Sequence, residues 1–303
     1  MISLLPSATE MVYALGRGAD LVGRSEECDF PSEVRRLPPV MRARWHDSDR
    51  PSSEIDARVR ASLRSGESLY LLDLERLAEL RPDLILTQDL CRVCSVTDAE
   101  VVDGCRAAGV DPRIVSLSPT RLAGVWESLE TLGEALGEGT RAAEMADGLR
   151  RRTRPAAPTG TSPAPTVAVV EWVDPPILSG LWTPDLIRAA GAREIGPAPG
   201  DSARGTTWAE LAAQRPDLVV VSPCSFALER TRREIAATPT VVDGLDRLAR
   251  TGRVVLADEA YFSRPGPRLA ESVGLVRALL AGEVPTSALP FENWPGRSEA
   301  VRP

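Results

Sequence analysis

Cysteine and carboxylate side chains gather in two short segments of the chain, and together they could bind a metal ion. Cys91 and Cys94 form a CxxC pair, and Cys28 lies in the acidic run Glu26–Asp29. Each segment follows an expected strand, and loops after parallel strands meet at one edge of a sheet. Three thiolates and a carboxylate suit zinc or another thiophilic ion. The alternative is that these are reduced core cysteines, because free cysteine is often buried.

The second half of the chain carries an acid and an indole at the end of an expected strand. Glu171, Trp172 and Asp174 follow the apolar run 167–170, and Pro175 and Pro176 predict a turn. An indole could form a wall for a flat ring, and a carboxylate could accept from an amide or pair with a cation. Simple packing is the alternative interpretation.

A third group, Tyr261, Phe262 and Arg264, follows the expected strand at 253–257. The two rings could stack on a ligand, and the guanidinium group suits a phosphate or a carboxylate. Arg264 fits a structural ion pair equally well.

The composition excludes several classes of protein. All 36 residues counted as Lys or Arg are arginine, so Schiff bases, pyridoxal-phosphate anchors and P-loops are excluded. The single histidine, His46, excludes two-histidine metal signatures and makes a hydrolase triad improbable. A net charge of -7 argues against nucleic-acid binding.

No membrane insertion is expected, because no apolar stretch approaches the roughly 18 residues that a membrane helix needs. The first strand, expected at 2–5, has no charged segment or cleavage site before it, and five cysteines fit a reducing compartment. A cytoplasmic location is therefore expected, or an extracytoplasmic one if a leader has been removed.

An internal repeat predicts the architecture. Leu77, Ala78, Arg81, Pro82, Asp83 and Leu84 match Leu211, Ala212, Arg215, Pro216, Asp217 and Leu218 at one constant offset. Each copy reads as a helix, a Pro-Asp turn and a buried strand. Further short strands are expected at 21–23, 113–117, 167–170 and 253–257. The fold class is therefore α/β, with two Rossmann-like lobes and mainly parallel sheets.

Four parts of the chain are expected. An N-terminal α/β lobe at 1–120 precedes a helical spacer and linker at 121–165, in which one long helix joins the lobes. A C-terminal α/β lobe at 166–283 precedes a Pro-rich tail at 284–303, expected to run over the surface. The stretch 45–47 and a helix near 53–63 are interpreted as a lid.

Several strings together resemble one family. LPSATE near the start, LVGRSEECDFP at 21–31, RPDLILTQ at 81–88, EWVDPPILSG at 171–180 and YFSRPGPRL at 261–269 occur in the order typical of class III periplasmic binding proteins. The chain is most similar to the cobalamin-binding-protein-like subset that lacks a signal peptide and carries an LTQDLCRVC-like string. The resemblance implies two lobes joined by one long helix, with a ligand held in the cleft between them.

The resemblance implies non-catalytic binding of a corrinoid and no required cofactor. The ligand-binding residues it implies lie in loops after strands and are Pro6, Ser7, Glu26, Glu27, Tyr70, Gln88, Glu171, Trp172, Tyr261, Phe262 and Arg264. At Glu27, Leu69 and Ala203 the sequence lacks the aromatic residues of transport members. Docking to an ABC transporter is expected to be unlikely without export.

Two alternatives remain open. The protein could bind a metal ion or an iron chelate if Cys28, Cys91 and Cys94 meet. It could also be a cytoplasmic enzyme that uses Cys28 or Cys91 as a nucleophile and Glu27 or Glu171 as a base.

Overall fold

The computed structural model describes all residues except 46–49, 91–95, 156–162, 287–288 and 297–303. The chain divides into two compact units, which are described separately. Unit 1 comprises 1–50, 57–119 and 123–148, and unit 2 comprises 51–56, 120–122 and 149–303.

The sheet of unit 1 has six strands in the order β4-β3-β2-β1-β5-β6. All neighbouring pairs are parallel except β3 with β4. The strands are β1 (Ile2–Ser3), β2 (Gly23–Ser25), β3 (Pro39–Ala43), β4 (Tyr70–Leu72), β5 (Leu84–Thr87) and β6 (Arg113–Ser116).

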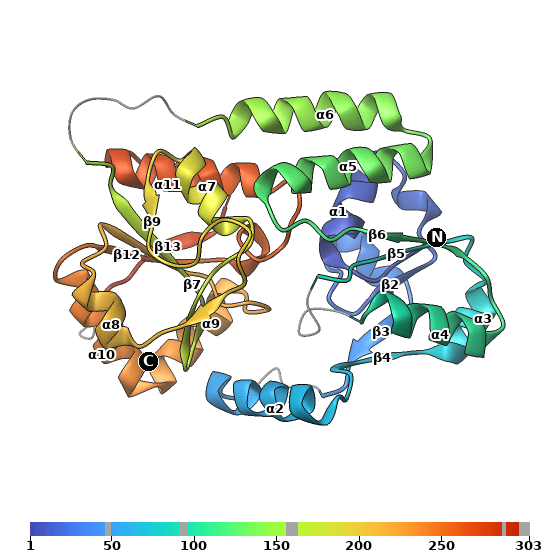
Figure 1. Ribbon diagram of the computed structural model, residues 1–303, viewed down its shortest axis with the longest axis horizontal. Helices are drawn as coiled ribbons and strands as arrows, with labels where there is room; N and C mark the ends of the chain where they lie inside the picture. The colour runs from blue at the N-terminus through green and yellow to red at the C-terminus, as the bar shows by residue number, and fades with distance from the viewer. Residues whose placement is uncertain (46–49, 91–95, 156–162, 287–288, 297–303) are drawn as a thin grey trace. The chain divides into compact units, whose positions relative to one another are not determined.

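Helices cover both faces of this sheet, with α3 and α4 packed together on one face and α1 and α5 on the other (Figure 1). Two 3-10 helices, η1 and η2, lie between the first strands. The boundary between the units falls within α6, after Gly148. The elements are α1 (Pro6–Ala14), η1 (Gly18–Asp20), η2 (Ser32–Arg36), α2 (Ser52–Ser65), α3 (Leu74–Leu80), α4 (Asp98–Ala108), α5 (Leu122–Leu136) and α6 (Gly139–Arg152).

The sheet of unit 2 has the order β10-β8-β7-β11-β12-β13, and β9 also pairs with β7. Its centre, β7-β11-β12, is parallel, and the middle strand β11 (LVVV) is fully apolar and buried, as expected for a strand covered on both faces. The strands are β7 (Thr166–Val173), β8 (Pro176–Leu178), β9 (Arg193–Glu194), β10 (Arg204–Gly205), β11 (Leu218–Val221), β12 (Arg253–Ala257) and β13 (Phe291–Asn293).

Two helix pairs flank this second sheet, with α7 packed on α11 on one side and α8 packed on α10 on the other (Figure 1). The elements are α7 (Thr183–Ala189), α8 (Trp208–Ala213), α9 (Leu228–Ala237), α10 (Pro239–Ala249), η3 (Glu259–Tyr261) and α11 (Leu269–Ala281). The α/β class with two mainly parallel sheets, expected from the sequence, is confirmed.

The internal repeat is visible in the backbone. In each unit a helix (α3 or α8) leads through a Pro-Asp turn into a central strand (β5 or β11). The arginine before each turn has a positive φ, 40° at Arg81 and 49° at Arg215. The carbonyl oxygens of Asp83 and Asp217 each accept the backbone N–H that begins the next parallel strand, at 2.9 Å in both cases.

Two expectations about elements were wrong in detail. Leu21 ends the turn of η1, so β2 begins only at Gly23 instead of covering 21–23. The expected surface tail contains β13, which pairs antiparallel with β12. Leu289, just before β13, is buried as well. The short strands β4, β8, β9, β10 and β13 were not expected.

No helix in the described ranges is long and apolar enough to cross a membrane.

Candidate functional site

The loop after β2 is shaped by one arginine of unit 1. The guanidinium group of Arg24 donates from Nε to the carbonyl oxygen of Leu37 at 3.1 Å. Its Nη1 donates to the carbonyl oxygens of Ser25 at 2.9 Å and Glu26 at 3.0 Å. Arginine suits this task, because its planar fork carries five donors. The loop that carries Glu26 and Glu27 is therefore held against β2.

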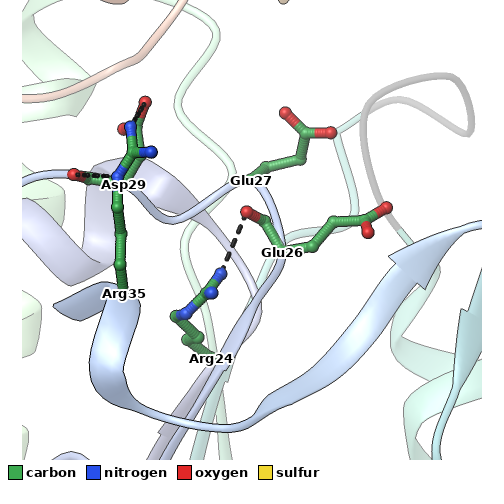
Figure 2. A pocket seen from close by; sticks show the side chains of 5 residues that line it. All are labelled: Arg24, Glu26, Glu27, Asp29 and Arg35. Carbon is green, nitrogen blue, oxygen red and sulfur yellow. Dashed lines mark hydrogen bonds and ion pairs between the residues drawn. The ribbon is translucent and has the colours of Figure 1, made fainter. Parts of the chain in front are cut away.

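A polar pocket of about 220 Å³ lies at this loop and is lined by Arg24, Glu26, Glu27, Asp29 and Arg35 (Figure 2). The guanidinium group of Arg35 pairs with the carboxylate of Asp29 at 3.5 Å. Figure 2 shows the side chains of Glu26 and Glu27 extending away from this ion pair. Three carboxylates and two guanidinium groups thus line the pocket, which is rich in hydrogen-bond acceptors.

Cys28 belongs to the same loop, but its side chain is fully buried. The hydroxyl group of Thr9 donates to Cys28 Sγ at 3.0 Å, and the thiol lies 3.8 Å from the carbonyl oxygen of Ser3. These contacts tie the loop after β2 to β1 and α1. They match the alternative of a packed core cysteine.

The expected metal site lies partly outside the described residues, because Cys91 and Cys94 belong to 91–95. Within the part of the chain that the structure describes, no three His, Cys, Asp or Glu side chains are grouped so as to hold a metal ion. A site formed by Cys28, Cys91 and Cys94 stays a prediction.

The other expected residues of unit 1 lie around the carboxyl edge and on β4. Pro6 and Ser7 form the first turn of α1, where proline suits the N-terminus because its nitrogen has no hydrogen to leave unpaired. Ser7 is buried, and so is Gln88, which directly follows β5. Tyr70 begins β4 and packs against the hydrophobic core. Its side chain therefore contributes to packing at the edge strand.

Three loops of unit 2 are linked at the carboxyl edge of its sheet. The carbonyl oxygen of Glu171 in β7 accepts the backbone N–H of Cys224, after β11, at 3.0 Å. The thiol of Cys224 in turn contacts the hydroxyl group of Ser263, after β12, at 3.3 Å. Cys224 therefore connects the end of β7 to the loop after β12.

An aromatic group lies at the same edge. The ring centroids of Trp172 and Phe226 are 5.2 Å apart with an interplanar angle of 60°. The guanidinium carbon of Arg230 lies 3.8 Å from the centroid of the Phe226 ring. Sequence reasoning missed Phe226 and Arg230. The sequence could have indicated Phe226, because it follows the buried strand β11 by only five residues and so belongs to a loop after a strand.

The turn after β7 carries a perturbed carboxyl group. Asp174 and Pro175 connect β7 to β8. Burial, followed by the negative charges of Glu234 and Asp56, raises the pKa of Asp174 above its ordinary value. This carboxyl group therefore takes up a proton more readily than an isolated aspartate.

The three expected residues after β12 have different surroundings. Arg264 Nη2 lies 2.6 Å from Glu259 Oε1, and both side chains are about nine-tenths buried. Phe262 is buried, and its carbonyl oxygen accepts from Nε1 of Trp182 at 2.9 Å. Tyr261 is half-buried, and the guanidinium carbon of Arg268 lies 4.8 Å from its ring centroid. Of the two rings, that of Tyr261 is the less buried.

Comparisons with known proteins identify relatives of this chain. The chain is 25% identical over 150 residues to an uncharacterized ABC transporter substrate-binding lipoprotein, YvrC, of Bacillus subtilis (strain 168), and the match spans 50% of this chain and 38% of that protein. It is 23% identical over 275 residues to a vitamin B12-binding protein of Photorhabdus laumondii subsp. laumondii, covering 89% of this chain and 83% of the relative.

A solved structure has the same fold. A periplasmic heme binding protein from Pseudomonas aeruginosa superposes with a TM-score of 0.69 at 23% identity, covering 96% of each chain. One relative carries the description of an ABC transporter substrate-binding protein, so the comparisons do not support the expectation that transporter docking is unlikely. Residues 1–261 match the model of a protein family that is described as "Periplasmic binding protein". The chain therefore belongs to the periplasmic binding protein family.

Proposed function

We propose that this protein is a substrate-binding protein of the ABC transporter type and that its ligand is a corrinoid. The observation that carries the choice of ligand is the acceptor-rich pocket of unit 1, lined by Arg24, Glu26, Glu27, Asp29 and Arg35. Docking to the membrane subunits of a transporter is part of the proposal.

The donors of the pocket are already engaged. Arg24 donates to three backbone carbonyl groups, and Arg35 pairs with Asp29. Glu26 and Glu27 also line this pocket, and one carboxylate oxygen of Glu26 accepts the backbone N–H of Ala43. Carboxylate oxygens accept hydrogen bonds from amide NH₂ groups, whereas they repel other carboxylates.

Two classes of large planar chelate differ in the groups at their edges. A corrinoid carries neutral amide side chains, which can donate hydrogen bonds to carboxylates. A heme carries two carboxylates, which need cationic partners. The pocket of unit 1 therefore favours the corrinoid.

Unit 2, taken by itself, carries aromatic side chains on which a flat ring could stack. Trp172 and Tyr261 are half-buried at the carboxyl edge of its sheet. Aromatic side chains contribute a large contact area and fixed geometry to ligand binding. Neither residue carries the choice between the two chelates, because both ring systems stack on aromatic groups.

The test is a titration of the reduced protein with hydroxocobalamin, followed by corrin absorbance and tryptophan quenching. Saturable one-to-one binding with a dissociation constant of about 1 μM or lower is expected, which corresponds to roughly 8 kcal/mol. Ferric heme, a ferric hydroxamate and zinc serve as parallel probes. Tighter binding of any of these than of hydroxocobalamin would overturn the proposal.

Two matched variants test whether the carboxylates of the pocket select hydroxocobalamin over heme. Glu27→Gln removes one negative charge from the pocket, so the affinity for hydroxocobalamin falls several-fold and that for ferric heme rises. Glu75→Gln removes one exposed charge from α3 and leaves both affinities unchanged. Equal effects of the two substitutions would contradict the assignment of Glu27.

A further inference from the structure

The first turn of α2 is held by unit 2. Residues 51–56 are grouped with unit 2, whereas the remainder of α2 belongs to unit 1. Ser52 begins the helix and is fully buried, although the residues on either side of it are exposed. The buried serine therefore marks the point where this turn packs.

A carboxylate of α9 holds Ser52. Glu234 Oε1 accepts the backbone N–H of Ser52 at 2.7 Å and its hydroxyl group at 2.5 Å. The first N–H groups of a helix have no partner within the helix, and a negative charge is favourable at that end. Glu234 thus caps the N-terminus of α2 from a distant part of the sequence.

A tryptophan of β7 contacts the same turn. Trp172 Nε1 donates to the carbonyl oxygen of Ser52 at 3.3 Å. The polar atoms of Ser52 are thereby bound by two elements of unit 2, α9 and β7. The contact also engages the indole N–H of Trp172, so a ligand that needs this donor has to displace the turn.

Three carboxyl groups lie around this contact. The charges acting on Asp174 come from Glu234 in α9 and Asp56 in the first turn of α2. Like charges at short range repel, and burial strengthens this effect. The docked turn therefore carries unfavourable electrostatic energy whenever Asp174 is ionised.

We propose that residues 51–56 form a latch that Glu234 and Trp172 hold on unit 2, and that protonation of Asp174 tightens this latch. The latch covers the indole N–H of Trp172 when it is docked. A fall in pH therefore favours the covered state, and a rise in pH favours release of the turn.

The direction of this pH effect follows from the raised pKa of Asp174. Burial and the two neighbouring carboxylates raise the pKa of Asp174 in the docked state. Release of the turn removes the charge of Asp56 from this group and so lowers the pKa of Asp174, and docking is therefore strongest at low pH. The docking energy is lost as the pH rises through the raised pKa of Asp174.

The test is hydrogen exchange of the full chain, read by mass spectrometry on a peptide that covers 51–56. After correction for the intrinsic exchange rate, protection in the wild type should fall several-fold between about pH 5 and pH 8. Asp174→Asn should keep protection high across this range, because the amide is always neutral. Glu234→Ala should lower protection about tenfold or more at every pH, because two hydrogen bonds to a charged group are lost.

Two further variants exclude a general loss of structure. Glu229→Ala removes an exposed carboxylate from the same helix, and should behave as the wild type. Ser52→Ala removes only the hydroxyl donor, and should lower protection less than Glu234→Ala does. Protection that is independent of pH in the wild type, or unchanged by both Glu234→Ala and Ser52→Ala, would overturn the proposal.

Discussion

Replacement of Arg264 by glutamine tests whether this arginine serves the fold or a ligand. Arg264 pairs with Glu259 at 2.6 Å, and about 10% of each side chain is exposed. The substitution leaves the carboxylate of Glu259 buried without this cationic partner. Removing one member of a buried ion pair costs about 3–5 kcal/mol of unfolding free energy. Arg264→Gln should therefore be among the more damaging substitutions in unit 2.

The expected change in melting temperature follows from the size of the unit. For a unit of this size, 1 kcal/mol shifts the melting temperature by roughly 2–4 °C, so a cost of about 3–5 kcal/mol means that Arg264→Gln should lower it by about 6–20 °C. The double variant Glu259→Gln with Arg264→Gln removes both charges. It should recover a large part of the loss, because no buried charge is left behind.

Differential scanning calorimetry of the unliganded protein is the assay. Arg247→Gln, an exposed arginine in the last turn of α10, is the matched control and should leave the melting temperature within about 1 °C of the wild type. If Arg264→Gln also melts within about 2 °C of the wild type, the argument from the buried ion pair is refuted. A large loss of ligand affinity in such a stable variant would assign Arg264 to the ligand.

Three further predictions concern other parts of the chain. Cys224 is half-buried, whereas burial raises the pKa of the Cys105 thiol. Iodoacetamide should therefore modify Cys224 faster than Cys105 at pH 8, which mass spectrometry of tryptic peptides can measure. Equal rates of modification would contradict this difference between the two thiols. Hydrogen bonds from the start of β7 hold the pKa of Asp217 below its ordinary value, so its stabilising effect is present above pH about 4 and is lost as the pH falls through the lowered pKa. Urea unfolding of Asp217→Asn should therefore differ from the wild type near neutral pH and converge with it in acid, and a constant difference would count against this. Leu77→Ala and Leu211→Ala remove equivalent buried side chains of the two repeats, and each should cost about 2–5 kcal/mol in its own unit, read as the loss of hydrogen-exchange protection in β5 or β11 respectively.

The repeated helix and strand were predictable because their signals are local. Pro82 and Pro216 interrupt the apolar helical pattern, and a run of buried apolar residues follows each of them. These signals do not depend on any partner distant in sequence. The class and the parallel centre of each sheet could therefore be predicted.

The short edge strands could not be predicted in the same way. β8, β10 and β13 contain two or three residues each, too few for an alternating pattern. Their strand geometry depends on hydrogen bonds to a partner strand. The sequence of β13 is further obscured by the Pro-rich residues around it.

The candidate site was predictable by position but not by orientation. The rule that loops follow the carboxyl ends of strands indicated the segments of Glu26 and Glu171, and the structure places Glu26 directly after β2 and Glu171 near the end of β7. It does not say which side chain of a loop faces inward. Cys28 is buried because Thr9 donates to its sulfur from α1, and that contact joins residues that are distant in sequence.

The position of β13 also affects how the protein folds during synthesis. All six strands of unit 1 lie within residues 2–116, so its sheet can pair completely while β7 is still being made. The sheet of unit 2 lacks its last strand until residues 291–293 have left the ribosome. Until then the outer edge of β12 has unpaired backbone groups, which are a template for pairing with another chain. A ribosome that stalls after α11 therefore holds a chain whose first sheet is complete and whose second is open to aggregation.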